Sequence, residues 1–233
     1  MTRSRRARMS VALCAAVLSA GLFALGVWQV QRLQWKQALI AQVHQRVHAA
    51  PVAAPGPAAW PALTRETDEY RHLRLAGQFL DQHSALVQAS TVLGAGYWVL
   101  TPLRADDGSI VLVNRGFVAT RSAPPAGSDR VSVTGLLRMS ETGKPFMRDN
   151  NPAEQRWYTR NVQAIAAAQG LGAVAPYFLD QDAGAAANGP VGGLTVISFK
   201  NNHLVYALTW FALSLMAAGG GVLVARTGHP KTS

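Results

Sequence analysis

The stretch MSVALCAAVLSAGLFALGVWQV, residues 9–30, decides the fold class of this chain, because it runs for 22 residues without a charge. A second uncharged stretch of equal length, LVYALTWFALSLMAAGGGVLVA, occupies residues 204–225. As a helix rising 1.5 Å per residue, each would span roughly 33 Å, enough for a hydrocarbon core of about 30 Å. The sequence therefore predicts two transmembrane helices, assigned to residues 9–31 and 203–225.

The first stretch has an alternative interpretation as a signal peptide. It is long for the apolar part of such a peptide, and no convincing A-x-A cleavage site follows it, so we favour an uncleaved anchor. The single cysteine, Cys14, lies inside this stretch, which excludes a disulfide framework or a cysteine-based metal site within the chain.

Small residues recur along both stretches at helical spacing, a pattern that lets two helix backbones approach closely. The alternative is that alanine is simply abundant here. The two stripes consist of Ala16, Ala20 and Ala24, and of Ser214, Ala218 and Gly221.

Positive charge is concentrated beside the two uncharged stretches. The formal net charge is +10, yet all twelve acidic residues lie between Lys36 and Lys200, where lysines and arginines nearly balance them. We interpret this distribution as a topology signal and not as a nucleic-acid-binding face, so no nucleic-acid partner is predicted. The flanking cations are Arg3, Arg5, Arg6, Arg8, Arg32, Arg226 and Lys231.

The positive-inside rule gives the predicted topology. Residues 1–8 and 226–233 form cytoplasmic tails, and residues 32–200 lie on the outer side. The arginine-rich N-terminus resembles an organelle presequence, but the first span begins by Met9. We therefore expect a multi-pass protein of a bacterial inner membrane, with the main domain in the periplasm and the lipid bilayer as its surroundings.

After the first span the helical pattern continues into water and should stop before Pro51. Trp28, Arg32 and Trp35 share one helix face, where the arginine could stack on the indoles. The segment 49–64 is rich in proline and alanine and is predicted to be a linker or an extended arm.

The rest of the outer segment has the alternation and the turn residues of β-strands. Gly77 is a possible bulge, and Gly135 a possible break in the alternation. We expect an α+β membrane protein whose two transmembrane helices flank one β-rich, mainly antiparallel extracytoplasmic domain, a small barrel or a sandwich. The predicted strands are 69–80, 84–91, 96–103, 108–118, 129–138, 174–180 and 194–199, with a short helix at 161–170.

No motif in the chain indicates catalysis. A G-x-S-x-G sequence, a P-loop, an H-E-x-x-H sequence and a dinucleotide fingerprint are all missing. His44 and His48 have metal-capable spacing, but no third ligand is near them in sequence, and we favour a solvated helix face. The sequence therefore predicts a protein that is not an enzyme.

His203 stands at the head of the second apolar stretch, where an ionisable group is rare without a use. One interpretation is an ordinary interfacial histidine. Another is a functional side chain, since His203, Ala207 and Trp210 share a helix face at i, i+4 and i+7.

Three separated blocks resemble motifs of the surfeit locus protein 1 family. They are LGVWQVQRLQWK at 25–36, VLVNRGFV at 111–118 and NNHLVYALTWF at 201–211. Weaker blocks lie between them in the family's order: GLLR at 135–138, the Asn151-Pro152 turn, and residues 177–180 and 190–193. The chain departs from the family at Phe117, where tryptophan is usual, and at Ala119, where proline is usual.

The resemblance implies a membrane protein that helps to assemble cytochrome c oxidase, with subunit I and other assembly factors as partners. It further implies transient binding of haem a, with His203 as a ligand of the haem iron. Trp210 would offer an apolar surface to the macrocycle, with Ala207 leaving room, and Arg32 and Arg115 would pair with the propionates.

Alternatives remain open for several of these residues. Arg115 could be a structural strand-end arginine, and Trp28, the remaining candidate for cofactor binding, could be a membrane-interface anchor together with Trp35. A scaffold that contacts oxidase subunits without binding haem is the competing function.

Overall fold

The computed structural model describes residues 3–143, 148–184, 189–197 and 199–227. These residues form two compact units. A helical unit contains the chain up to Gln42 and again from Phe199, and a β-rich unit contains Val43–Ile197.

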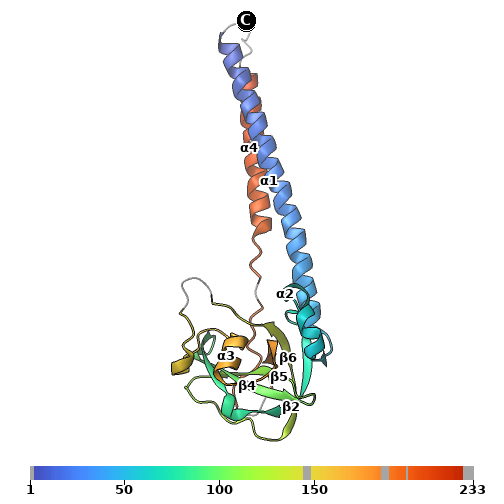
Figure 1. The fold of residues 1–233 in the computed structure, drawn as a ribbon. Helices are drawn as coiled ribbons and strands as arrows, with labels where there is room; N and C mark the ends of the chain where they lie inside the picture. Colours follow the sequence, from blue (N-terminus) through green and yellow to red (C-terminus); the bar gives the residue numbers. More distant parts are fainter. Residues whose placement is uncertain (1–2, 144–147, 185–188, 198, 228–233) are drawn as a thin grey trace. The chain divides into compact units, whose positions relative to one another are not determined.

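Two long helices make up the helical unit: α1 (Arg3–His48) and α4 (His203–Arg226). As predicted, α1 continues past the first apolar stretch and ends before Pro51. Both helices are long and apolar enough to cross a membrane, with windows of mean hydropathy 2.2 and 1.8. Figure 1 shows them side by side.

Small residues form the contact between α1 and α4. Ser19 Oγ donates to Ser214 O over 3.0 Å, and Ser214 Oγ donates back to Ser19 O over 2.9 Å. A Cβ added to Gly221 would come within 2.9 Å of the Ala15 Cβ. The close approach is confirmed for Ser214 and Gly221 of α4. The stripe predicted on α1 was wrong, because Ala16, Ala20 and Ala24 are exposed and the contact uses Ala15, Ser19 and Gly26 instead. Ala16, Ala20 and Ala218 line a groove of about 570 Å³.

The β-rich unit is built on seven strands: β1 (Val52–Ala53), β2 (His72–Phe79), β3 (Ala85–Thr91), β4 (Gly94–Ala105), β5 (Ile110–Val118), β6 (Arg130–Met139) and β7 (Val174–Gln181). They form one sheet in the order β1-β2-β6-β7-β5-β4-β3. An additional pairing of β2 with β4 closes five of them into a barrel, leaving β1 and β3 outside it. Of the two predicted architectures, the barrel is confirmed, and all ladders but β1–β2 and β5–β7 are antiparallel.

Short helices connect the strands: α2 (Arg65–Asp68), α3 (Val162–Ala168), and the 3₁₀ turns η1 (Pro57–Ala62), η2 (Asp81–His83) and η3 (Pro152–Glu154). The helix predicted at 161–170 is confirmed as α3, and Gly170 follows it with φ of +62°. A left-handed residue just after a helix is typical of a helix end.

Alternating strand residues supply two hydrophobic clusters, because neighbouring side chains point to opposite faces of a strand. Val111, Val113, Tyr177 and Leu179 belong to one cluster, and Leu112 and Phe178 belong to the other, which packs against Ile165 of α3. The β-rich unit therefore has its own core.

Two glycines allow the barrel to close tightly. A Cβ at Gly77 would lie 2.1 Å from Arg104 O of β4, and one at Gly135 would lie 2.2 Å from Asp180 O of β7. The predicted bulge at Gly77 and break at Gly135 were wrong, since the β2–β6 ladder runs through both without a shift. Both glycines serve close approach of neighbouring backbones instead.

The strand predicted at 194–199 was also wrong: residues 194–197 and 199 have no strand structure, and Ser198 lies outside the described residues. Both edges of β7 are already occupied by β5 and β6, so a closed barrel offers this segment no edge there. The segment 49–64 is an extended arm only in part, because Pro57–Ala62 within it form η1. Val52 and Ala53 pair with β2, and Trp60 Nε1 donates to Pro55 O over 2.9 Å.

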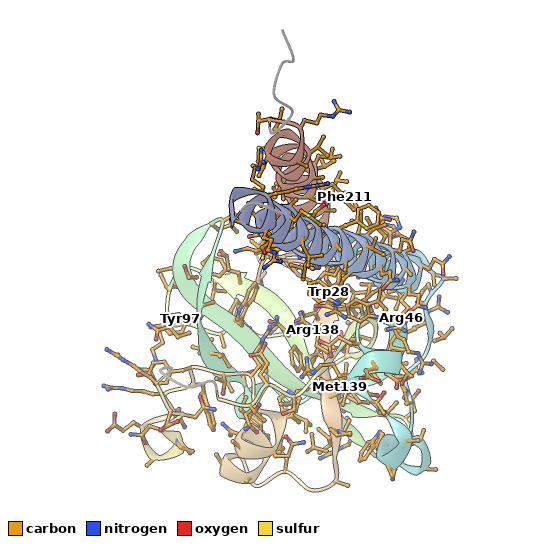
Figure 2. The ribbon with its side chains drawn as sticks, turned by 90° about the horizontal axis from the view of Figure 1, so that it is seen from above. Trp28, Arg46, Tyr97, Arg138, Met139 and Phe211 are labelled. Carbon is orange, nitrogen blue, oxygen red and sulfur yellow. The ribbon has the colours of Figure 1, made fainter. Side chains whose placement is uncertain are left out.

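Asp180 is the centre of a buried ion network in the barrel. It is 4% exposed and accepts hydrogen bonds from Asn114 (2.8 Å), Arg138 (3.0 Å), Arg160 (3.1 Å) and Thr195 (3.0 Å). Figure 2 shows Arg138 beside Met139, the last residue of β6. Four partners compensate the desolvation of one buried carboxylate.

Each of the two arginines in this network also pairs with a second carboxylate. Arg138 pairs with Glu69 over 2.9 Å, and Arg160 pairs with Glu141 over 2.6 Å. Burial acts to raise the pKa of Glu141, but the hydrogen bonds and charge of Arg160 outweigh it and hold that pKa below its usual value. Glu141 is therefore charged in the folded protein at neutral pH.

Replacing Gly77 by valine should destabilise the barrel by about 3 kcal/mol, since the new side chain collides with β4 backbone that cannot move without opening the closure. Urea unfolding of the detergent-solubilised full chain, followed by tryptophan fluorescence, measures the change. Gly172→Ala is the matched control because a Cβ there meets nothing within 4 Å. Equal stability of the two variants would contradict the close approach of β2 and β4.

The pH dependence of stability tests the Glu141–Arg160 pair. Because the folded-state pKa of Glu141 is lowered, its contribution to stability is present above the ordinary value of 4.5 and is lost as the pH falls through the folded pKa. The difference in unfolding free energy between the parent and Glu141→Gln should be largest at neutral pH and should shrink below pH 4.5. A difference that does not change with pH would contradict the pairing.

Cysteine cross-linking tests the helix pair. In a Cys14→Ala background, Ser19→Cys with Ser214→Cys should form a disulfide on mild oxidation, since the two hydroxyl oxygens are 3.0 Å apart. Intact mass, through the loss of two hydrogens, detects the bond. Leu18→Cys with Leu215→Cys is the control, because these side chains are 57% and 74% exposed. Cross-linking of the control pair alone would contradict the observed helix faces.

Candidate functional site

His203 is the first residue of α4, and its side chain reaches across to α1. Its Nδ1 lies 2.7 Å from Oε1 of Gln29, which is only 9% exposed. One turn earlier on α1, Gly26 leaves space that the ring of Phe211 fills. The contact of two closely packed helices therefore brings the glutamine amide to the histidine ring.

This hydrogen bond determines which ring nitrogen carries the proton. The amide oxygen of Gln29 can only accept, so Nδ1 of His203 must donate. In the neutral ring the lone pair then lies on Nε2, for which the described residues provide no hydrogen-bond partner. Metal-bound histidines commonly donate their second ring N–H to an oxygen in this way. The pair can therefore present Nε2 as a ligand atom.

Two cations lie further along the same face of α1. Arg32 and Lys36 follow Gln29 at i+3 and i+7, roughly 4.5 Å and 10.5 Å along the helix. The predicted stacking of Arg32 is confirmed for Trp35, whose ring centroid is 4.6 Å from the guanidinium carbon. Lys36 Nζ lies 5.9 Å from the ring centroid of Phe199, just before α4. Two positive charges therefore lie on the C-terminal side of Gln29 along α1.

The structure changes the interpretation of Ala207. His203, Ala207, Ser214 and Gly221 lie on one face of α4, and three of them contact α1 residues. Ala207 itself is 1% exposed. The expectation that Ala207 leaves room for a macrocycle was wrong, because the space is used for helix packing. Trp210 lies near this face and remains half-buried.

Trp28 is on α1 next to Gln29 but is 51% exposed, and Tyr206 on α4 is 53% exposed. The Gln29–His203 contact puts these aromatic residues at the same end of the helix pair (Figure 2 labels Trp28). Such exposed aromatics at one level are typical of a membrane interface. Their exposure favours the anchor interpretation, and a cofactor contact of Trp28 stays a prediction.

Arg115 is part of β5 in the barrel and is 8% exposed. Its guanidinium donates to Pro124 O over 2.6 Å and to Pro125 O over 3.2 Å, and it lies 3.9 Å from Asp81. Burial lowers the pKa of Arg115, partly offset by the charge of Asp81. These contacts favour the structural interpretation of Arg115 that the sequence left open.

The other histidine pair lies elsewhere on α1. The rings of His44 and His48 stack with centroids 4.1 Å apart, and Nδ1 of His48 is 2.8 Å from His44 O. Among the described residues, no group of three histidine, cysteine or acidic side chains could hold a metal ion.

Comparison with known proteins places residues 16–215 in the SURF1 family. The chain belongs to the SURF1 family. It is 32% identical to the mouse (Mus musculus) surfeit locus protein 1 over 220 residues, which covers 84% of this chain and 70% of the relative. It is 34% identical to the human (Homo sapiens) protein over 220 residues, covering 82% and 70% of the two chains. A SURF1-like protein of Monosiga brevicollis is 34% identical over 230 residues, covering 88% and 84%.

The family predicted from the sequence motifs is thus confirmed. Membership of the SURF1 family implies a part in the assembly of cytochrome c oxidase and suggests a non-catalytic role. The two apolar helices indicate membrane association.

Sequence reasoning missed Gln29 and Lys36. Both residues lie in a helix that was correctly predicted, but a glutamine in a boundary segment gives no sign of its partner. Helical spacing could have revealed them. Gly26, Gln29 and Lys36 recur at i, i+3 and i+10 and so share one face of α1, which is the face that meets α4.

Proposed function

We propose that this protein is a membrane-anchored assembly factor that holds haem a for insertion into subunit I of cytochrome c oxidase, and that His203 would hold the haem iron. The observation that carries the proposal is the His203–Gln29 hydrogen bond of 2.7 Å. It commits Nδ1 to donation and leaves Nε2 with a lone pair, which is the form of imidazole that ligates haem iron.

The donor set fits a haem. When bound, haem a would supply an iron that needs one or two ligand atoms from the protein. A single histidine oriented by an amide meets that requirement. Gln29 restrains the ring and makes Nε2 a better electron donor, because its oxygen attracts the Nδ1 proton.

Charge and polarity around the ring also fit. The propionates of a haem are anionic, and Arg32 and Lys36 lie one and two turns past Gln29 on the same helix face. Asn201, two residues before His203, has a buried Oδ1 with no hydrogen-bond partner among the described residues. Such an orphan acceptor is costly and is consistent with a partner that arrives on binding.

The proposed location follows from the helices. Arginines precede the first span and Arg226 ends α4, so both termini are assigned to the cytoplasm of a bacterial inner membrane. His203 and Gln29 then lie at the periplasmic boundary, and the β-rich unit lies in the periplasm. Oxidase subunits and other assembly factors are the proposed partners.

Absorption spectra of protein co-expressed with the haem a biosynthetic enzymes and purified in mild detergent test the function. The parent should carry haem a, and His203→Ala should lose it. Gln29→Leu keeps the side-chain size but removes the acceptor, and should weaken haem a retention by about 10- to 100-fold.

Gln31→Leu is the matched control, because Gln31 is exposed on the same helix. It should retain haem a like the parent. A parent that carries no haem but still co-purifies with oxidase subunits would instead support a scaffold without haem. Haem a retention in His203→Ala equal to the parent would contradict the ligand assignment.

A further inference from the structure

A second feature, independent of haem, is an arginine cleft on the β-rich unit. The cleft has a volume of about 290 Å³. Leu86 and Gln88 of β3 and Tyr97 of β4 form one wall, with Tyr97 near the margin of the unit in Figure 2. The facing residues are Arg121, Arg148, Gln155, Arg156, Trp157 and Tyr158. Three guanidinium groups therefore share one cleft, and no carboxylate is among the described residues that line it.

Five other arginines of this unit have carboxylate partners. Those of the ion network and its surroundings pair with carboxylates at 2.6–3.3 Å; these pairs are Arg65–Glu69, Arg71–Asp68, Arg130–Asp106, Arg138–Glu69 and Arg160–Glu141. In the cleft, Arg121 and Arg148 form no ion pair with any described residue. Arg121 donates to Gln155 O over 3.1 Å, and Arg148 lies 5.9 Å from the ring centroid of Tyr158.

Arg156 is the third arginine, and it pairs with Glu154 over 3.1 Å. Both side chains of that pair are more than half exposed, so solvent screens it strongly. Asp149 is the other acidic neighbour in sequence, and it does not line the cleft. The cleft thus keeps an excess of positive charge.

The segment 150–159, which carries Arg156, is held in place by its own hydrogen bonds. Asn150 Oδ1 accepts from the backbone N–H groups of Tyr158 (2.7 Å) and Thr159 (3.0 Å). Asn151 and Arg156 exchange two backbone hydrogen bonds, and Trp157 is 2% exposed. A wall fixed before binding reduces the entropy lost when a ligand is captured.

The cleft also lies at a strand edge that is only partly paired. β3 is one of the two end strands of the sheet. At the cleft its outer edge carries a parallel bridge between Val87 and Trp157, in which Gln88 N donates to Trp157 O over 2.8 Å. Beyond Gln88 the same edge continues through Ser90 to a turn where Val92 is 88% and Leu93 is 53% exposed. An exposed edge strand can accept one more strand from a partner chain.

We propose that the arginine cleft and the outer edge of β3 form a docking surface for an extended, acidic segment of a partner protein. Guanidinium groups bind carboxylates through paired hydrogen bonds, and the two tyrosine hydroxyl groups add further donors. The cleft is small and open, which suits side chains inserted from a segment better than an enclosed small molecule. The exposed valine and leucine offer that segment an apolar contact.

Titration of the full-length protein in zwitterionic lipid nanodiscs tests the proposal. The probe is a labelled twelve-residue peptide of alternating glutamate and threonine, which favours an extended strand, compared with its glutamine–threonine counterpart. The acidic peptide should bind, with an affinity that falls as salt is added, and should slow hydrogen exchange of the β3 amides. The neutral peptide should bind at least about tenfold more weakly.

Matched charge variants locate the site. Arg121→Gln with Arg148→Gln should weaken binding of the acidic peptide about tenfold. Arg74→Gln with Arg104→Gln removes the same charge from exposed arginines outside the cleft and should change binding less than twofold. Equal losses in the two double variants, or no preference for the acidic peptide, would overturn the proposal. Displacement by millimolar inorganic phosphate, but not by sodium chloride of equal ionic strength, would identify a free-anion site instead and overturn it as well.

Discussion

Close contact between two helix backbones is the constraint on which the helical unit depends. Ser19 and Ser214 exchange hydrogen bonds through each other's carbonyl groups, and Gly221 rests against Ala15. In a bilayer such contacts replace the hydrophobic effect as the source of helix association. Only helices this close allow a glutamine side chain on α1 to reach a histidine on α4. The small residues of α1 and α4 therefore position Gln29 and His203 for their hydrogen bond.

The β-rich unit also depends on close backbone contact, which glycines allow between its strands, and on a buried ion network. Gly77 and Gly135 let neighbouring strands close a five-stranded barrel, and Asp180 gathers two arginines, an asparagine and a threonine. Thr195 lies in the segment that follows the last barrel strand, so its hydrogen bond to Asp180 also holds that segment against the barrel. Arg115, which motif resemblance marked for cofactor binding, is used to hold backbone carbonyls within this unit.

Local sequence patterns predicted the helices and strands. The roles of single residues such as Gly77 and Gln29 depend on contacts with residues far away in the sequence. Uncharged runs revealed both helices, and alternation revealed every strand of the barrel. Gly77 was misread as a bulge because its true reason, the carbonyl of Arg104 on another strand, is invisible in its own neighbourhood. The segment 194–199 was expected to be a strand, yet both edges of the preceding strand β7 are already paired. At the site, His203 was conspicuous as an ionisable group in an apolar run, whereas Gln29 looked like one of several glutamines.

We propose that Nε2 of His203 binds the iron of haem a. Pulsed electron paramagnetic resonance on ferric protein, loaded with haem a and labelled with ¹⁵N only in histidine, tests it most directly. Ligation by His203 predicts a strong coupling between the iron and one histidine ¹⁵N that disappears in His203→Gln. Retention of that coupling in His203→Gln, or haem a bound in the parent without any histidine coupling, would contradict it.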